Sequence, residues 1–404
     1  MKNEANFIPD KNNSDIAKKI LTLRGESSLK SINYFYDLML KRFSDREFFA
    51  VGGFNVGYFC NIVPEEMIIA CGATPVRLCS EDSLCASAGE ELMPGDICPV
   101  IKSICGVSLN GGFRDINLLV IPATCDGKVK LAEILTGSNE LYFLDLPRDS
   151  DYIKNFDVWF EKYADFYEFL KKKTGKKPSR KDLLSACRIT NERTEIFNKI
   201  FKLRAQFPGL MSASDYFIMG NSSFFAGAAE WTEKAKILYE ELLERKKTVS
   251  VKNVRKKIIL AGSPVIFPNY KILEILEDAG CDIAAELMCS SYGRLADPVV
   301  IDEETENGII RSLCLKYVSA SMCPCFIGMK KLADRIVENV GDYGLDGVIY
   351  HNLRLCQVFE MQTVPFRLRM REEKIPFLSV KTDLSSEDTG QLKTRIEAFL
   401  EMLG

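Results

Sequence analysis

Two series of short apolar runs, each run separated from the next by a helix-length segment, constrain the fold of this 404-residue chain most strongly. The first series contains the runs 73–79, 116–125 and 139–147. The second series contains the runs 255–263, 281–288, 317–322, 345–352 and 375–383. Because strands joined by helix-length connections pair in parallel, we expect an α/β protein with two lobes, each containing a parallel, Rossmann-like sheet.

The segments outside these series have helical patterns. Residues 1–46 include an amphipathic stretch, and residues 151–248 are rich in charge, with apolar side chains at helical spacing. We therefore predict four parts: an N-terminal helical segment at 1–46, a first α/β lobe at 47–150, a helical section at 151–248 and a second α/β lobe at 249–404.

Charge and hydropathy exclude several classes of partner. The chain carries 53 basic and 56 acidic side chains, a formal charge of −3, and no basic stripe that would favour nucleic acid. The polar start lacks the apolar core of a signal peptide, and no apolar run approaches the ~18 residues of a membrane span. We expect a cytoplasmic protein that binds neither nucleic acid nor membrane.

Fourteen cysteines and a single histidine are unusual for such a protein. A reducing cytosol does not sustain disulfides, so cysteine there is more often a metal ligand or a catalytic group. Several cysteines end an apolar run, at the point where a buried strand is expected to pass into a helix. Cys125 is an example, in the stretch "VIPATCDGK".

The cysteines of the two lobes share a spacing. In the first lobe, Cys60, Cys98 and Cys125 are separated by 38 and 27 residues. In the second lobe, Cys289, Cys323 and Cys356 are separated by 34 and 33 residues. Since parallel strands end at the same edge of a sheet, cysteines one β-α unit apart can converge on one point between the lobes. Helices that begin just after them would direct N–H groups at a thiolate or an anionic sulfide cluster. We predict six metal ligands: Cys60, Cys98, Cys125, Cys289, Cys323 and Cys356.

Packing is the competing interpretation, because free cysteine often acts as a small buried hydrophobe. We assign that role to the cysteines within apolar or helical patterns: Cys71, Cys105, Cys187, Cys281 and Cys314. Cys79 and Cys325 are kept as reserve ligands.

The ligand type favours iron and sulfide over zinc. No paired CxxC knuckle occurs, and the nearest pair is Cys323 and Cys325. Scattered sulfur ligands in a large α/β fold suit an iron–sulfur cluster, although the ferredoxin spacing is also absent. Glycine-rich stretches lack the G-x-G-x-x-G and P-loop spacings, so we expect no nucleotide site in this chain.

Several motifs resemble the 2-hydroxyacyl-CoA dehydratase D-component family, and within it the double-cubane cluster protein branch. The most specific are "ICPVIKSICG" (97–106) and "TCDGK" (124–128); "MCPCF" (322–326) and "DGVIYHNLRLCQVFE" (346–360) are similar as well. The resemblance covers nearly the whole chain from about residue 30. It implies that Cys98, Cys125 and Cys356 bind one [4Fe–4S] cubane.

In the double-cubane branch, further cysteines allow two cubanes joined by a sulfide, an [8Fe–9S] cluster. By the pattern of the lobes, the additional ligands here would be Cys60, Cys289 and Cys323. The resemblance also implies a partner, a dimeric iron–sulfur ATPase that injects electrons at low potential.

Five other side chains are weaker candidates. Lys102 and Lys128 could stabilise the charge of a cluster, or could be solvated lysines. His351 could donate a proton, although a lone histidine at a strand end is more often structural. Glu65 and Glu66 could shuttle protons, but their place in a first helical turn is already explained by the helix dipole.

Three functions are therefore weighed. The first is an ATP-dependent, low-potential reductase that acts on a small molecule at a double cubane. The second is a 2-hydroxyacyl-CoA dehydratase subunit with one [4Fe–4S] cluster, and the third is a non-enzymatic iron–sulfur carrier or scaffold. Six well-placed cysteines favour the first, since three suffice for the second. A chain with a complete ligand set is expected to form a homodimer.

Overall fold

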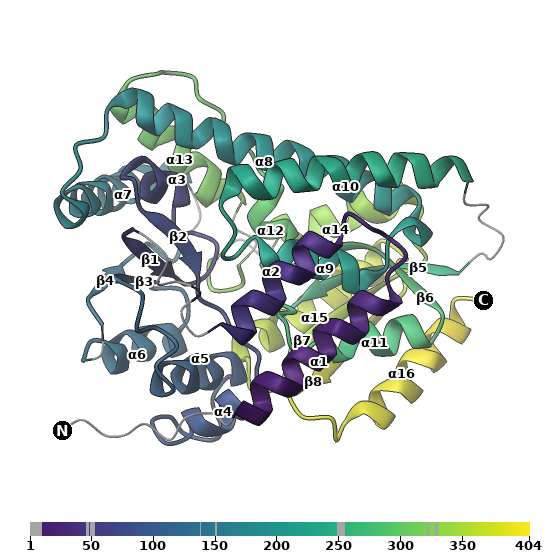
Figure 1. Cartoon of the computed structure of the whole chain (residues 1–404). Helices are drawn as coiled ribbons and strands as arrows, with labels where there is room; N and C mark the ends of the chain where they lie inside the picture. Colours follow the sequence, from purple (N-terminus) through teal and green to yellow (C-terminus); the bar gives the residue numbers. More distant parts are fainter. Residues whose placement is uncertain are drawn as a thin grey trace.

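The computed structural model describes residues 10–404 except 46, 47, 49–52, 138, 150, 151, 249–254, 321, 322, 328 and 329. Two four-stranded sheets form its two lobes, and every neighbouring pair of strands is parallel (Figure 1). The prediction of two lobes with parallel sheets is confirmed.

The two sheets have the same strand order. The first sheet has the order β2-β1-β3-β4 and contains β1 (Asn55–Tyr58), β2 (Thr74–Arg77), β3 (Leu118–Pro122) and β4 (Leu141–Leu144). The second has the order β6-β5-β7-β8 and contains β5 (Lys256–Gly262), β6 (Cys281–Leu287), β7 (Gly347–Leu353) and β8 (Phe377–Thr382). The inner strands β3 and β7 are buried along their whole length, as expected where helices cover both faces of a parallel sheet.

Short helices connect the strands of the first lobe. They are α3 (Glu65–Ala70), α4 (Ser83–Gly89), α5 (Pro99–Leu109) and α6 (Asp126–Leu135). Asp82 caps α4 by accepting hydrogen bonds from the N–H groups of Leu84 and Cys85, and Pro99 occupies the first turn of α5, where its missing N–H is not needed.

The helical section and the N-terminal helices lie against both lobes. The section contains α7 (Tyr152–Thr174), α8 (Arg180–Gln206), a 3-10 turn (Pro208–Leu210), α9 (Ala213–Ser222) and α10 (Ala228–Thr248). It is preceded by α1 (Asp10–Glu26) and α2 (Asn33–Ser44). In Figure 1, α8 and α10 cross the top of the molecule, and α1 and α2 cross in front of it. A reciprocal capping box between Ser179 and Asp182 fixes the start of α8.

The second lobe adds six helices among the described residues: α11 (Lys271–Asp278), α12 (Tyr292–Leu295), α13 (Glu306–Ala320), α14 (Lys330–Tyr343), α15 (Gln357–Glu372) and α16 (Thr389–Met402). Within the part of the chain that the structure describes, no helix is both long enough and apolar enough to cross a bilayer.

The apolar run at 317–322, placed by its sequence among the strands of the second lobe, is corrected by the structure. Its described residues, 317–320, are the last turn of α13. The buried side chains of this helix include Ile309, Leu313 and Val318, a helical spacing that the short run did not reveal. They belong to the same hydrophobic core as β1, β3 and α7 of the first lobe.

Three helices therefore pack in the core of the lobe that lies further from them in the sequence. Helix α13, late in the chain, completes the core of the first lobe. Helices α1 and α2, early in the chain, pack in the core of the second sheet through residues such as Ile20, Phe35 and Met39.

Candidate metal centre

Eight cysteines line one cavity of about 360 Å³, which lies at the carboxyl ends of both sheets. They are Cys60, Cys79, Cys98, Cys125, Cys289, Cys323, Cys325 and Cys356. The structure thus brings together all six predicted ligands and both reserve ligands. The packing cysteines Cys71, Cys105, Cys187, Cys281 and Cys314 are buried and lie elsewhere.

Most of these cysteines follow directly after a strand. Cys60, Cys79 and Cys125 come within three residues of the ends of β1, β2 and β3, and Cys289 and Cys356 occupy the corresponding places after β6 and β7. This is the edge of a parallel sheet at which α/β proteins bind ligands.

Three of the cysteines also begin helices. Cys98, Cys125 and Cys356 are the N-cap residues of α5, α6 and α15. The backbone N–H groups of Val100 and Ile101 favour the thiolate of Cys98 and lower its pKa, and those of Gly127 and Lys128 act in the same way on Cys125. The positive ends of these helices favour negative charge on the sulfur atoms.

Unusual backbone geometry accompanies two of the sites. Cys60 has a φ of 63° and Leu355, the residue before Cys356, a φ of 68°, both in the left-handed region that side chains other than glycine rarely adopt. At the end of β5, Gly262 has a φ of 111°, and a Cβ there would lie 2.1 Å from the carbonyl oxygen of His351. Backbone conformations of this kind persist where surrounding packing imposes them, often at functional sites.

The cysteines form two groups by their mutual contacts. Cys98 and Cys356 share a hydrogen bond, and each also feels the charge of Cys125. Cys60 and Cys289 instead have Cys79 and Cys323 as their thiol neighbours, while Cys323 also adjoins Cys325 and Cys125 and so links the two groups. Each group contains three of the predicted ligands.

The cysteines differ in how readily they ionise, and the difference does not follow the two groups: the hydrogen bond to Cys98 raises the pKa of Cys356, and the hydrogen bond from Cys325 lowers that of Cys323. The hydrogen bond from the Cys325 thiol, helped by the Lys128 ammonium and the N–H groups of α6, lowers the pKa of Cys125 to about 6 despite burial. A hydrogen bond from Cys356 likewise lowers the pKa of Cys98. Burial raises the pKa of Cys60 and of Cys289 to about 12, and Lys128 and Arg77 offset this only in part. Thiolates at the last two positions need a bound cation such as a metal.

Two buried cations adjoin the sulfur atoms. The Lys128 ammonium lies 4.6 Å from the centre of the Phe59 ring and acts on both Cys60 and Cys125. Arg77 donates from Nη1 to the carbonyl oxygen of Cys289 at 2.6 Å. Positive charge at this depth fits an anionic ligand set.

The donor set fits an iron–sulfur cluster. Thiol sulfur is a soft donor that suits iron and sulfide, and eight such donors surround one cavity. Among the described residues, no three or more cysteine, histidine or acidic side chains are arranged around a single metal ion. In a polynuclear cluster each thiolate binds a different iron, so its ligands stand further apart than those of one ion.

Glu65 and Glu66 lie outside this cavity, in a buried network of ion pairs. Arg193 and Arg294 bind the carboxylate of Glu65 and, although burial opposes ionisation, hold its pKa at about 2. Lys316 donates to Glu66 at 2.7 Å, and the hydroxyl groups of Tyr317 and Thr190 donate to it as well. These contacts join α3 to α8, α12 and α13.

His351 and Lys102 also lie outside the wall of the cavity, whereas Lys128 forms part of it. His351 is buried in β7, with Nδ1 3.2 Å from the Ser263 carbonyl oxygen and Nε2 2.7 Å from the Thr382 hydroxyl. The Lys102 ammonium points back along α5 and donates to Glu90 and to the Gly95 carbonyl.

Arg77 and Glu81 were missed by the sequence reasoning. Arg77 is the last residue of β2 and stands two positions before Cys79. A basic residue so close to a cysteine at a strand end is a sequence signal that could have identified Arg77. Glu81 is buried near Cys79 and Cys98, and burial raises the pKa of its carboxyl well above the usual range. No local pattern distinguishes Glu81 from a surface acid.

Comparison with known proteins gives a consistent result. Residues 60–403 match the family described as 2-hydroxyglutaryl-CoA dehydratase, D-component. The chain is 24% identical to the (R)-phenyllactyl-CoA dehydratase beta subunit of Clostridium sporogenes, over 93% of this chain and 100% of that one. It is 21% identical to the (R)-2-hydroxyglutaryl-CoA dehydratase subunit beta of Acidaminococcus fermentans, over 88% and 93%. It is 20% identical to a benzoyl-CoA reductase subunit of Thauera aromatica, over 84% and 87%.

Proposed function

The chain belongs to the 2-hydroxyglutaryl-CoA dehydratase D-component family, and on that premise we propose that it is an iron–sulfur reductase whose cluster is held in the eight-cysteine cavity. Its relatives are named as subunits of dehydratases and of a reductase. When bound, the cluster would supply single electrons at low potential to a small molecule.

A double cubane is proposed because eight cysteines line one cavity, whereas one cubane needs three. Cys98, Cys125 and Cys356 would hold one cubane, and Cys60, Cys289 and Cys323 the other. The convergence of all six predicted ligands on this cavity is the observation that carries the proposal. A single cubane would leave Cys60 and Cys289 as buried thiols at the ligand-binding edge without a chemical use.

The chain's own residues would prepare the cavity for charge and exclude water. Lys128, Arg77 and the N-termini of α5, α6 and α15 would stabilise the negative charge of the ligands without reorganisation. Apolar side chains in the wall, including Ile101, Leu287 and Phe359, reduce the number of water molecules that can approach.

Two protein partners complete the proposal. The family resemblance supports a dimeric iron–sulfur ATPase as the electron donor, because reducing an anionic cluster at low potential is energetically uphill. A second copy of this chain is proposed as the permanent partner, since symmetric dimers are the commonest oligomers. Mass measurement in solution tests the dimer, and a strict monomer would contradict it.

The alternative function is a 2-hydroxyacyl-CoA dehydratase subunit with one [4Fe–4S] cluster on Cys98, Cys125 and Cys356. Two of the three relatives named above are dehydratase subunits, which favours this alternative. The ordered positions of these three cysteines at helix N-termini are equally compatible with it.

Iron and acid-labile sulfide analysis of the anaerobically purified protein decides between the two. The double cubane predicts about eight irons per chain, and the dehydratase subunit predicts about four. Stoichiometric zinc without sulfide would contradict both.

A further inference from the structure

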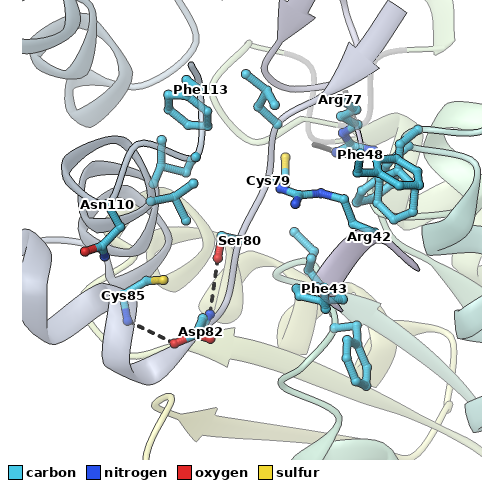
Figure 2. Close-up of a pocket in the computed structure, with 18 of the residues that line it drawn as sticks. Arg42, Phe43, Phe48, Arg77, Cys79, Ser80, Asp82, Cys85, Asn110 and Phe113 are labelled. Carbon is cyan, nitrogen blue, oxygen red and sulfur yellow. Dashed lines mark hydrogen bonds between the residues drawn. The ribbon is translucent and has the colours of Figure 1, made fainter. Parts of the chain in front are cut away.

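A second cavity, of about 180 Å³, adjoins the eight-cysteine cavity (Figure 2). The two share three wall residues, Arg77, Cys79 and Ile266. Figure 2 shows Arg42 reaching into the second cavity from α2, with Cys79 and Ser80 on the segment that follows β2. A molecule bound here would adjoin Cys79, which belongs to the walls of both cavities.

Aromatic rings supply most of the apolar wall of this second cavity. They come from α2, from the segment after α5, from the end of α9 and from the loop after β5: Phe43, Phe113, Phe224, Phe225 and Phe267. Rings from four directions favour a ligand with a flat, apolar body, because ring faces and edges pack against such a body at low entropic cost.

Arg77 brings a buried positive charge to the shared wall. Its side chain is only 3% exposed and its guanidinium stacks on Phe224 at 4.5 Å. Its Nη1 donates to the Cys289 carbonyl, its Nε has no hydrogen-bond partner, and no carboxylate of the described residues forms an ion pair with it. On the side of the cysteine cavity, negative charge on Cys79 and Cys289 favours the guanidinium. A buried guanidinium with no carboxylate partner is costly, so the second cavity favours an anion.

Asn221 provides a second unpaired donor in the same wall. It is 1% exposed, and its Oδ1 accepts hydrogen bonds from the Phe267 N–H and the Tyr270 hydroxyl. Its Nδ2 has no partner. Two buried, unpaired N–H donors around one cavity call for an acceptor group such as a carboxylate.

The acidic groups of the second cavity do not cancel this preference. Asp82 accepts hydrogen bonds from Leu84 and Cys85 and thereby caps α4. Asp45 is exposed on the rim, as is Arg114, and Asp115 beside Arg114 is half-buried. Arg77 is therefore the charged group where the cavity meets the cysteines, and Arg42 of α2 adds a second guanidinium to the wall.

We propose that the second cavity binds a small carboxylate with a flat, apolar body, its carboxylate on Arg77 and its body among the phenylalanine rings. A volume of about 180 Å³ suits a single-ring acid and lies below the ~300–1,000 Å³ of sites for larger ligands. The site names a substrate class for the proposed reductase and rests on that function only for the step after binding.

Calorimetric titration of the anaerobic, iron-containing protein with benzoate and with benzamide tests the binding. The two probes have the same ring and differ in charge. Benzoate is expected to bind at least about tenfold more tightly than benzamide, because only the acid offers a carboxylate to the buried guanidinium of Arg77. Equal affinities, or no binding of either probe, would overturn the inference.

Three variants locate the ligand. Arg77→Gln should remove the preference for the acid, and Val107→Phe, which fills the cavity from α5, should weaken both probes about tenfold or more. The matched control Arg114→Gln removes a charge from the rim and should change affinity less than about threefold. Unchanged binding in Val107→Phe, or an equal loss in Arg114→Gln and Arg77→Gln, would overturn the assignment.

Iron content of each variant keeps this test separate from the proposed function. If iron is retained and benzoate does not bind, the carboxylate site is wrong and the reductase proposal stands. If the wild-type protein binds benzoate but holds zinc without sulfide, the reductase proposal is wrong and the carboxylate site stands. Should Arg77→Gln lose iron, Val107→Phe decides the outcome, because Val107 does not touch the cysteine cavity.

Discussion

The thiol of Cys325 lies between Cys125 and Cys323 and hydrogen-bonds to both. It is thus the point where the two groups of cysteines meet, since Cys125 belongs to one group and Cys323 to the other. Two cubanes joined by a shared sulfide would require such closeness between their ligand sets. The predictions below separate cysteines that bind iron from side chains that only support the fold.

The first prediction concerns the group at the helix N-termini. Cys98→Ser, Cys125→Ser and Cys356→Ser should each lose iron and ATP-dependent reductase activity, because a hydroxyl is a poor ligand for iron. Iron and sulfide analysis measures the loss. Full iron content in all three would contradict the assignment of the cavity as a metal centre.

The second prediction concerns the other group. Cys60→Ser, Cys289→Ser and Cys323→Ser should lower the iron content as strongly as the first three do. Cys187→Ser serves as the matched control and should retain iron, since Cys187 is buried away from the eight-cysteine cavity. If these three variants instead retain about four irons per chain, the protein is a one-cubane dehydratase subunit.

The third prediction concerns packing cysteines. Cys71→Ser should keep its iron and lose about 1–3 kcal/mol in free energy of unfolding, because it places a hydroxyl in an apolar core. Cys281→Ser should lose less, since its sulfur already lies 3.4 Å from the Lys256 carbonyl and a hydroxyl can donate there. Urea unfolding compares the two. A larger loss in Cys281→Ser would contradict this account.

The fourth prediction tests whether Glu66 is structural. Glu66→Gln leaves the buried Lys316 ammonium without its counter-ion and should cost about 3–5 kcal/mol in stability, with iron content unchanged. The double variant Glu66→Leu with Lys316→Met removes both charges and should recover much of that loss. A stable Glu66→Gln protein that retains iron but loses activity would instead favour the proton-shuttle role.

The fifth prediction concerns acid stability. Burial lowers the pKa of His351 from 6.5 to about 4, so between these values the unfolded chain binds a proton that the folded chain does not. Stability from this group is therefore lost as the pH falls, by about 1.3 kcal/mol between about pH 7.5 and pH 5.5.

His351→Asn removes the titrating ring while keeping a donor for the Ser263 carbonyl. The difference in thermal midpoint between the wild-type protein and this variant should shrink as the pH is lowered across that interval. A difference that does not vary with pH would show that folding does not shift the pKa of His351.

The sequence predicted the sheets and the cysteines because both are encoded locally. An apolar run followed by a helix-length segment predicts a parallel strand, and a cysteine at its end is placed at the ligand-binding edge whatever the strand order is. The strand order itself, and the helical state of 317–320, depend on packing between distant segments.

The polar residues of the two cavities were harder to predict for the same reason. Asn221 and Arg77 meet only because α9 packs near the end of β2, which no spacing reveals. Lys102 shows the opposite case, since a lysine four positions after Cys98 was expected near the cluster and instead binds Glu90. Side-chain direction on a helix is decided by neighbours that the local pattern does not contain.

The exchange of helices between the lobes has a mechanical consequence. Helix α13 completes the core of the first sheet, and α1 and α2 complete the core of the second. The chain therefore crosses between the lobes several times, and each lobe depends on segments from the other half of the sequence. Neither 1–248 nor 249–404 would fold as an isolated fragment. Hinge opening between the sheets would have to detach α13 from α7, so the sulfur atoms of the two lobes are held at a fixed separation.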